Sequence, residues 1–253
     1  MGRIYDHQFV GAGLGVPYYV GDIAQTMGML RPGINFSLGR EMSKYANIKL
    51  QVMAGMYGAA DSLSSGSRKD RNLHFISPLA EAAVIMEWEI LRSFDNKFYD
   101  KSGISPYISY GLGLFFMSPY AKYQGKWHSL HALGTEGQYL DEVNYPKPYS
   151  KIQAFVPLSG GIKYFMNKSF AIYAELGYRF TFTDYMDDSG SGIYPDKTKM
   201  QAVNTIAAAL SDPRKTGVST GDVRGNPRSK DHYFYPNLGV IWVLKNTGSS
   251  GYR

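Results

Sequence analysis

The feature that most constrains the fold is an alternation of apolar with small or polar side chains, which recurs in eight segments of the 253-residue chain. In residues 170–183, Phe, Ile, Ala, Leu, Tyr, Phe and Phe occupy every second position, and Ala, Tyr, Glu, Gly, Arg and Thr lie between them. A period of two is typical of a β-strand with two unlike faces, because successive side chains point to opposite sides. The predicted strands are residues 9–18, 32–38, 46–58, 76–90, 107–116, 152–164, 170–183 and 234–244.

The connections between the predicted strands alternate in length. Residues 42–44 and 166–168 form tight turns and 93–103 a moderate one, whereas the long connections are residues 21–30, 61–72, 118–150 and 186–231. Short turns at one end and long loops at the other are typical of outer-membrane barrels, which close because hydrocarbon cannot satisfy an open sheet edge. The sequence therefore predicts an all-β fold, an eight-stranded antiparallel up-and-down transmembrane β-barrel with short periplasmic turns and long extracellular loops, in one domain over residues 1–253.

Two other folds compete for the same pattern, a spanning helix and a soluble barrel. The longest uncharged stretch, residues 102–121, contains two Pro and three Gly, and its apolar residues alternate, so a helix fits it poorly. A soluble lipocalin-like barrel would turn a charged face to water, but only 19% of this chain is charged, against roughly 25% in soluble domains. We also expect aromatic residues near the strand ends to form interfacial girdles. These residues are Tyr18, Tyr19, Trp88, Phe115, Phe116, Tyr120, Tyr164, Phe165, Tyr185 and Trp242.

Seven charged residues fall on the small, Gly-rich face of the predicted strands and should point into the lumen. They are Lys49, Glu81, Glu87, Glu89, Lys163, Glu175 and Arg179. Three bases and four acids in a narrow lumen should pair as an ion-pair and hydrogen-bond plug, because small barrels are filled by side chains. A narrow conducting path or a proton-linked site is the alternative, for which eight strands leave little room.

The chain offers few of the groups on which enzymes rely. It has no Cys, which excludes disulfides, thiolate metal sites and cysteine catalysis. Three groupings of His with other polar residues are the remaining candidates, and none has a spacing such as H-E-x-x-H or G-x-S-x-G. They are His74 with Ser77 and Glu81, Asp184 with Asp231 and His232, and His128 and His131 with Glu136. We therefore predict no enzymatic activity, no cofactor and no metal site.

Two further patterns indicate ligands only weakly. Gly11, Gly13 and Gly15 are spaced as in phosphate-binding loops, but without a βαβ unit around them we expect glycines on the lumen face of a strand. An acidic group in the last long loop could bind a cation, although it lacks the spacing of an EF-hand. That group consists of Asp187, Asp188 and Asp196.

The net charge of +6 could indicate nucleic acid or an anionic membrane surface as a partner. The bases are interleaved with acids, however, with seven Lys or Arg against six Asp over residues 187–231. This favours a mixed, solvated surface and no nucleic-acid partner. The N-terminal residues lack the apolar region of a signal peptide, so we expect a processed form that begins near Arg3 or Ile4.

Four segments in and beside the predicted long loops carry recognisable motifs. They are residues 125–138 (GKWHSLHALGTEGQ), 175–188 (ELGYRFTFTDYMDD), 210–213 (LSDP) and 224–234 (RGNPRSKDHYF). In these motifs the chain resembles the PorG-like outer-membrane proteins of type IX secretion, and the resemblance spans essentially its whole length. It implies a non-enzymatic component of the secretion and gliding apparatus, which contacts a periplasmic ring built from a PorK-like lipoprotein and PorN. A lipid-modifying barrel enzyme and a surface-facing adhesin are the alternative classes.

The longest predicted periplasmic turn, residues 93–103, holds three aromatic residues, Phe94, Phe98 and Tyr99. Aromatic side chains are enriched at interface hot spots. If the ring lies in the periplasm, these residues are the predicted partner contacts, and both chain ends emerge on the same side. The other predicted partners are outer-membrane lipid and lipopolysaccharide.

Overall fold

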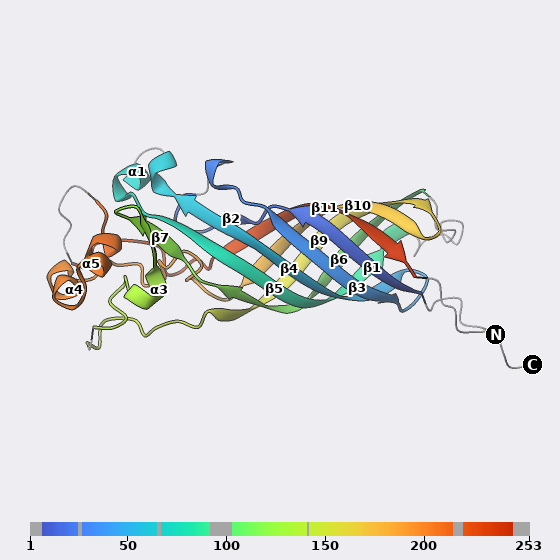
Figure 1. Cartoon of the computed structure of the whole chain (residues 1–253). Coiled ribbons are helices and arrows are strands. Elements are labelled where there is room, and N and C mark those ends of the chain that lie inside the picture. Colours follow the sequence, from blue (N-terminus) through green and yellow to red (C-terminus); the bar gives the residue numbers. More distant parts are fainter. Residues whose placement is uncertain are drawn as a thin grey trace, which may run out of the picture.

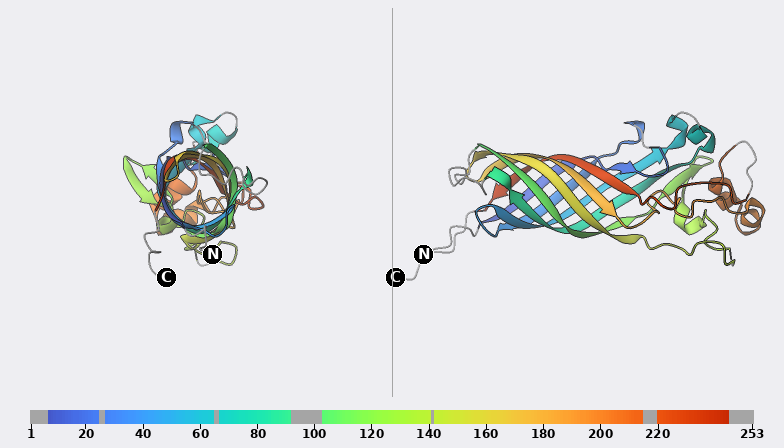
Figure 2. Two further views of the ribbon diagram at one scale, coloured as in Figure 1. Left: turned by 90° about the vertical axis from the view of Figure 1, so that its right-hand side faces the viewer. Right: turned by 180° about the vertical axis from the view of Figure 1, so that it is seen from behind.

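Eight long strands close into an up-and-down antiparallel barrel. The structure is a computed structural model that describes residues 7–24, 27–64, 67–91, 103–140, 142–214 and 220–244. The barrel strands are β1 (Gln8–Gly15), β3 (Gly33–Glu41), β4 (Ala46–Ala60), β5 (His74–Glu89), β6 (Gly103–Met117), β9 (Ile152–Asn167), β10 (Phe170–Thr181) and β11 (His232–Val243). Each pairs with the next along the chain, and β1 closes the ring against β11 from Phe9↔Val243 to Gly15↔Asn237. The predicted fold class is confirmed, and Figure 2 shows the closed ring end-on.

Short elements gather at the end of the barrel that bears the long connections (Figure 1). They are β2 (Tyr18–Val20), η1 (Met27–Met29), η2 (Asp61–Leu63), α1 (Ser67–Arg71), β7 (Tyr120–Tyr123), β8 (Lys126–Ser129), α3 (Leu130–Leu133), α4 (Lys197–Val203) and α5 (Thr205–Ser211). We call this end the cap and define it as the described residues of 18–31, 61–73, 118–151 and 182–231; the opposite end is the turn end.

The predicted first strand is split in two. β1 ends at Gly15 and β2 begins at Tyr18, where the chain pairs again with β11 through Phe234↔Tyr18. Pro17 lies between them and has no N–H to donate, so it cannot continue the ladder. The long loop predicted over 118–150 likewise contains structure of its own, the β7–β8 hairpin and α3.

The two faces of the barrel wall differ as the alternation predicts, with the apolar face outside. On β5, Val84 is 53% exposed and its neighbour Ile85 is 2% exposed. Large apolar side chains that are more than half exposed surround the wall: Leu14, Phe36, Leu38, Leu50, Val84, Tyr110, Leu112, Leu114, Leu158, Ile162, Leu176 and Leu238. A soluble barrel would need the reverse arrangement, because water disfavours so large an apolar surface. The chain is therefore a transmembrane barrel of the bacterial outer membrane.

No helix in the described part of the chain is long and apolar enough to cross a membrane.

The prediction of aromatic girdles is only partly right. Trp88, Tyr164 and Trp242 lie on the outer face and are 37–57% exposed. Tyr19, Phe115 and Phe165, by contrast, are buried, as is most of the ring-rich interior. The prediction took neighbouring aromatics together, as at 115–116 and 164–165, but consecutive strand residues point to opposite faces, so only one of each pair can meet lipid.

Glycine on the lumen face makes room for these interior rings. A Cβ added to Gly113 would lie 2.5 Å from the Phe155 ring, and one added to Gly39 would lie 2.1 Å from the Phe9 ring. These distances are too short for carbon atoms in contact. Each ring therefore packs directly on the backbone of the neighbouring strand, opposite the glycine that is its partner in the ladder.

Candidate functional site

The lumen near the turn end holds a buried cluster of charges from three strands. Glu87 accepts hydrogen bonds from Lys49 Nζ at 3.3 Å and from Lys163 Nζ. Lys163 also donates to Glu89 at 3.1 Å, and Asn47 donates to both carboxylates at 3.0 and 3.2 Å. In the β-ladder Asn47 lies opposite Glu87, so sheet register brings these two residues into contact, whereas Lys163 reaches the carboxylates from β9, which does not pair with β5.

A second set of lumen charges lies further toward the cap. Arg179 Nε contacts Glu81 Oε2 at 3.3 Å, and the Tyr233 hydroxyl donates to the other oxygen of Glu81 at 2.6 Å. Glu175 accepts from the Tyr107 hydroxyl at 2.8 Å and lies 3.7 Å from Lys49 Nζ, which joins it to the first set. All seven charged residues predicted to face the lumen are buried, and each forms an ion pair with another of the seven.

Apolar and aromatic layers pack above and below the charges. At the turn end the layer contains Phe9, Phe165, Ala171, Ile241 and Val243. Toward the cap the interior is filled by Tyr19, Tyr57, Phe75, Phe115, Phe155, Tyr233 and other buried side chains. The rings of Phe115 and Phe155 meet edge to face with centroids 5.9 Å apart. Side chains thus fill the lumen at successive levels.

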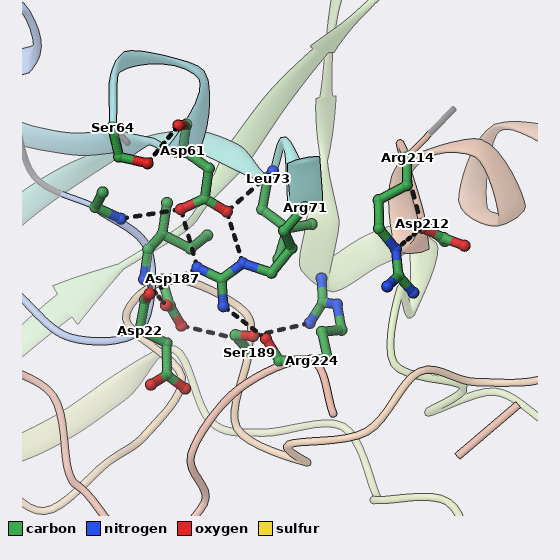
Figure 3. A network of polar contacts seen from close by, with 12 residues as sticks. Asp22, Asp61, Ser64, Arg71, Leu73, Asp187, Ser189, Asp212, Arg214 and Arg224 are labelled. Carbon is green, nitrogen blue, oxygen red and sulfur yellow. Dashed lines mark hydrogen bonds and ion pairs between the residues drawn. The ribbon is translucent and has the colours of Figure 1, made fainter. Parts of the chain in front are cut away.

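The cap is held by a second polar network, which centres on two arginines (Figure 3). Arg71 forms a bidentate pair with Asp61, through Nε at 2.6 Å and Nη2 at 2.9 Å. Its remaining donors reach the carbonyl oxygens of Asp22 and Arg224, both at 2.7 Å. One guanidinium thus joins the connections after β1, β4 and β10.

Arg224 is the second centre and is almost fully buried. Its Nη1 donates to Glu136 Oε1 at 2.8 Å and to the Asp188 carbonyl at 2.6 Å, and its Nε donates to the Ser211 carbonyl at 3.3 Å. Asp188 in turn accepts hydrogen bonds from Thr135 and Tyr149. The cap is therefore a cross-linked unit.

The buried hydroxyl of Tyr19 lies between two buried carboxylates of the cap. The Tyr19 hydroxyl lies 2.7 Å from Asp187 Oδ2 and 3.1 Å from Asp231 Oδ1. A phenol has one proton to donate, so two ionised carboxylates would leave one contact repulsive. Burial raises the pKa of Asp187 to about 6, and burial together with the neighbouring Asp187 raises the pKa of Asp231. Burial also raises the pKa of Asp184 to about 7, and its Oδ2 has no hydrogen-bond partner among the described residues.

The candidate catalytic groupings are not assembled. His74 lies on the outer side of β5, where its Nε2 is 3.1 Å from the Lys122 backbone nitrogen, whereas Ser77 and Glu81 are buried on the lumen side. His232 packs against the Tyr178 ring with centroids 5.4 Å apart, while Asp231 points inward to Tyr19.

The loop histidines and the weak ligand patterns also have structural roles. His131 Nε2 lies 2.9 Å from the Tyr149 carbonyl oxygen, while Glu136 pairs with Arg224. Asp196 accepts hydrogen bonds from Thr198 and Lys199 as the N-cap of α4, apart from the aspartates of the Tyr19 cluster. Gly11, Gly13 and Gly15 lie within β1. Among the residues described, no cluster of three or more His, Asp or Glu could hold a metal ion.

The sequence gives no signal for the cap contacts of Tyr19, Asp61 and Arg71, because periodicity identifies residues on strands and does not identify contacts between distant loops. Arg224 does lie in one of the recognisable motifs, and that was the available signal. The predicted contact residues Phe94, Phe98 and Tyr99 lie outside the described residues.

No protein-family model and no curated protein matches the chain. Solved outer-membrane proteins are distantly similar. Ail of Yersinia pestis, in complex with the heparin analogue sucrose octasulfate, is 10% identical with a TM-score of 0.46, over 95% of this chain and 100% of Ail. Neisserial surface protein A is 11% identical with a TM-score of 0.46, over 93% and 96% of the two chains. OprG of Pseudomonas aeruginosa is 9% identical with a TM-score of 0.42, over 96% and 98%. The fold assignment rests on this chain's own strand pairing.

Proposed function

We propose that the chain is a non-enzymatic, non-conducting outer-membrane component of a type IX secretion apparatus, which anchors or positions a periplasmic ring of PorK and PorN type. The observation that carries the proposal is the filled lumen, in which buried ion pairs lie between aromatic and apolar layers. Side chains that fill a small barrel at successive levels leave little room for a solute, which favours a function at its two ends. The dispersal of the candidate catalytic histidines supports a role without chemistry.

The convergence of the four recognisable segments supports the type IX assignment. Residues 125–138 contribute Glu136, residues 175–188 contribute Asp188, and residues 210–213 contribute Ser211. All three contact Arg224, which begins the fourth segment, 224–234. Motifs scattered over more than a hundred residues thus belong to one packed unit, which is the expectation when a sequence signature reflects a shared structure.

The turn end is the proposed contact with the ring. It is the end at which β1 begins and β11 ends, as the pair Phe9↔Val243 requires. β5 ends and β6 begins at the same end, and Phe94, Phe98 and Tyr99 come between these two strands in the sequence. A barrel closed at this end by a packed apolar layer is a rigid platform for a periplasmic assembly.

The proposal is tested by affinity purification of the full chain from native membranes in mild detergent. Wild-type protein should recover the lipoprotein and the second ring protein, and the triple variant Phe94→Ala, Phe98→Ala, Tyr99→Ala should lose both. The matched control is Trp127→Ala, Tyr139→Ala, Val143→Ala, which removes three exposed side chains from the cap and should retain the ring. Recovery of a complete ring by the first variant, or of no ring by the wild type, overturns the proposal.

A surface-facing adhesin-like role is the second candidate, and the cap carries the observation that favours it. Trp127, Tyr139 and Val143 are 48–102% exposed there. If the cap is the functional surface, the control variant will abolish attachment of whole cells to a target surface while the turn variant does not.

A further inference from the structure

The cap separates its charges by depth. Seven of its acids are buried, namely Asp61, Glu136, Asp184, Asp187, Asp188, Asp212 and Asp231, whereas Arg224 is its one buried base among the described residues. Nine of its bases are exposed: Arg68, Lys69, Lys122, Lys126, Lys147, Lys197, Lys199, Arg228 and Lys230. The exposed acids in the described part of the cap are three, Asp70, Glu142 and Asp222. A composition that reads as mixed along the sequence therefore folds into a cationic surface over an acidic interior.

The buried acids are needed where they are, because they hold the loops together. Asp61 accepts from the backbone nitrogens of Ala24 and Leu73, Asp187 from that of Ser189, and Asp231 from that of Met186. Loop backbone inside the cap requires such acceptors. Since these carboxylates are committed inward, they cannot neutralise the bases on the outer surface.

Five bases lie next to the strand ends, where the apolar wall meets the cap. We call them the cationic collar: Arg31, Lys122, Lys151, Arg228 and Lys230. Arg31 precedes β3 by two residues, Lys151 immediately precedes β9, and Arg228 and Lys230 precede β11 by four and two residues. Lys122 contacts His74, the first residue of β5, through its backbone.

Three collar side chains, those of Lys122, Arg228 and Lys230, are exposed, and those of Arg31 and Lys151 are half-buried. Within the described part of the chain, Lys122, Lys151, Arg228 and Lys230 form no ion pair, and Arg31 contacts only carbonyl oxygens. The first residues of the neighbouring strands that lie on the outer face of the barrel are apolar and exposed, such as Ile152 at 59% and Ile34 at 44%. Among the acids near this level, Asp61 and Asp231 point inward, while Asp184 lies close enough to Lys230 for that charge to oppose the rise in the pKa of Asp184. Cationic groups directly above a hydrocarbon-facing wall lie at the depth of lipid headgroups.

We propose that the cationic collar binds the phosphate groups of lipid headgroups in the outer leaflet, so that lipopolysaccharide is a bound ligand at the rim of the cap. Phosphate oxygens are strong acceptors for Lys and Arg, and each base near an anionic lipid surface contributes roughly 1 kcal/mol to membrane binding. The collar thereby fixes the height of the barrel in the membrane and surrounds the cap with bound lipid. This inference needs only the membrane barrel and is independent of the secretion role, whose contacts lie at the opposite end.

The test titrates purified full-length protein in mild detergent with diphosphoryl lipid A and measures bound lipid by native mass spectrometry. The collar variant carries Arg31→Gln, Lys151→Gln, Arg228→Gln and Lys230→Gln, and its affinity should fall at least tenfold. The matched control carries Arg68→Gln, Lys69→Gln, Lys126→Gln and Lys147→Gln, which removes the same charge away from the strand ends, and it should bind like the wild type. Unchanged gel mobility of unheated samples verifies that both barrels are folded.

Two further titrations show whether the collar binds the phosphate groups and whether those groups must belong to a lipid. Lipid A from which both phosphates have been removed should bind the wild type as weakly as diphosphoryl lipid A binds the collar variant. Inorganic polyphosphate, a soluble polyanion, should compete only at much higher phosphate concentration. Equal losses in the two variants, no loss in the collar variant, equal binding of the dephosphorylated lipid, or full competition by polyphosphate at matched phosphate would each overturn the proposal.

Discussion

The barrel lumen and the cap both bury several charges, but they are built in different ways. In the lumen, the charges sit on strands, and the inward-facing positions of β4, β5 and β9 bring Lys49 and Lys163 to Glu87. In the cap, two arginines donate to backbone carbonyls as well as to side chains and so connect loops that are far apart in sequence. The lumen network thus connects the strands of the barrel, whereas the cap network connects the loops at one end of it. Similar ion pairs and hydrogen bonds therefore stabilise the whole barrel in the lumen and only the loop structure in the cap.

The largest expected effect comes from removing a lumen cation. Lys163→Met leaves Glu87 and Glu89 buried with too few positive partners, and breaking a buried pair in this way typically costs about 3–5 kcal/mol. The free energy of unfolding should fall by that amount in urea titrations of barrels in lipid vesicles. Lys122→Met, which removes an exposed cap lysine, should change it by less than about 0.5 kcal/mol. Equal effects of the two substitutions would mean that the lumen pairs are not part of the barrel's stability.

The next largest effect is expected from the loss of Arg224 and should be confined to the stability of the cap. Arg224→Met removes hydrogen bonds to Glu136, Asp188 and Ser211 and leaves Glu136 buried without a cation, with only the Ser191 N–H still donating to it, a penalty of about 2–3 kcal/mol. Because the cap is laid over a closed barrel, the substitution should open the loops without unfolding the strands. Limited proteolysis should cleave the variant within residues 182–231 at least tenfold faster, with unchanged barrel unfolding in urea. A matching loss of barrel stability would abolish the distinction between the two networks.

A smaller change in the free energy of unfolding should distinguish a glycine substitution on the lumen face of the barrel wall from one on the outer face. Gly113→Ala would place a methyl group 2.5 Å from the Phe155 ring, and overpacking of this kind costs about 1–3 kcal/mol. Gly160→Ala is the matched substitution, because a Cβ there meets nothing within 4 Å. It should be neutral or slightly stabilising in the same urea titration. If both glycines tolerate alanine equally, the interior is less tightly packed than the rings indicate.

The same comparison explains how far the sequence could predict this molecule. The strands and the inward direction of residues such as Glu87 and Arg179 follow from a period of two, because the geometry of a strand allows only two faces. Nothing periodic marks Arg71 or Tyr19, whose partners lie tens to more than two hundred residues away. The charge pattern of the cap led to a wrong prediction, a mixed surface, for the same reason. Alternating Lys and Asp along a loop indicates a mixed surface until the fold buries one sign and exposes the other.

The smallest expected effect is a dependence of the cap on pH. The folded-state pKa of Asp187 is raised to about 6 by burial, and the pKa of Asp231 is raised by burial and by Asp187. A carboxyl with a raised pKa binds its proton more tightly when folded, so its contribution to stability is present below its unfolded pKa and is lost as pH rises through the folded value. The cap should therefore be more resistant to protease at pH 5 than at pH 8, by on the order of 1 kcal/mol or several-fold in cleavage rate. Asp231→Asn should flatten this dependence, since the amide keeps an acceptor for the Met186 N–H and removes the charge beside Asp187. Asp196→Asn, at the N-cap of α4, should leave the dependence intact. Greater protease resistance at pH 8 than at pH 5 would show that the Tyr19 contacts hold two ionised carboxylates. That result would contradict the raised pKa values of Asp187 and Asp231.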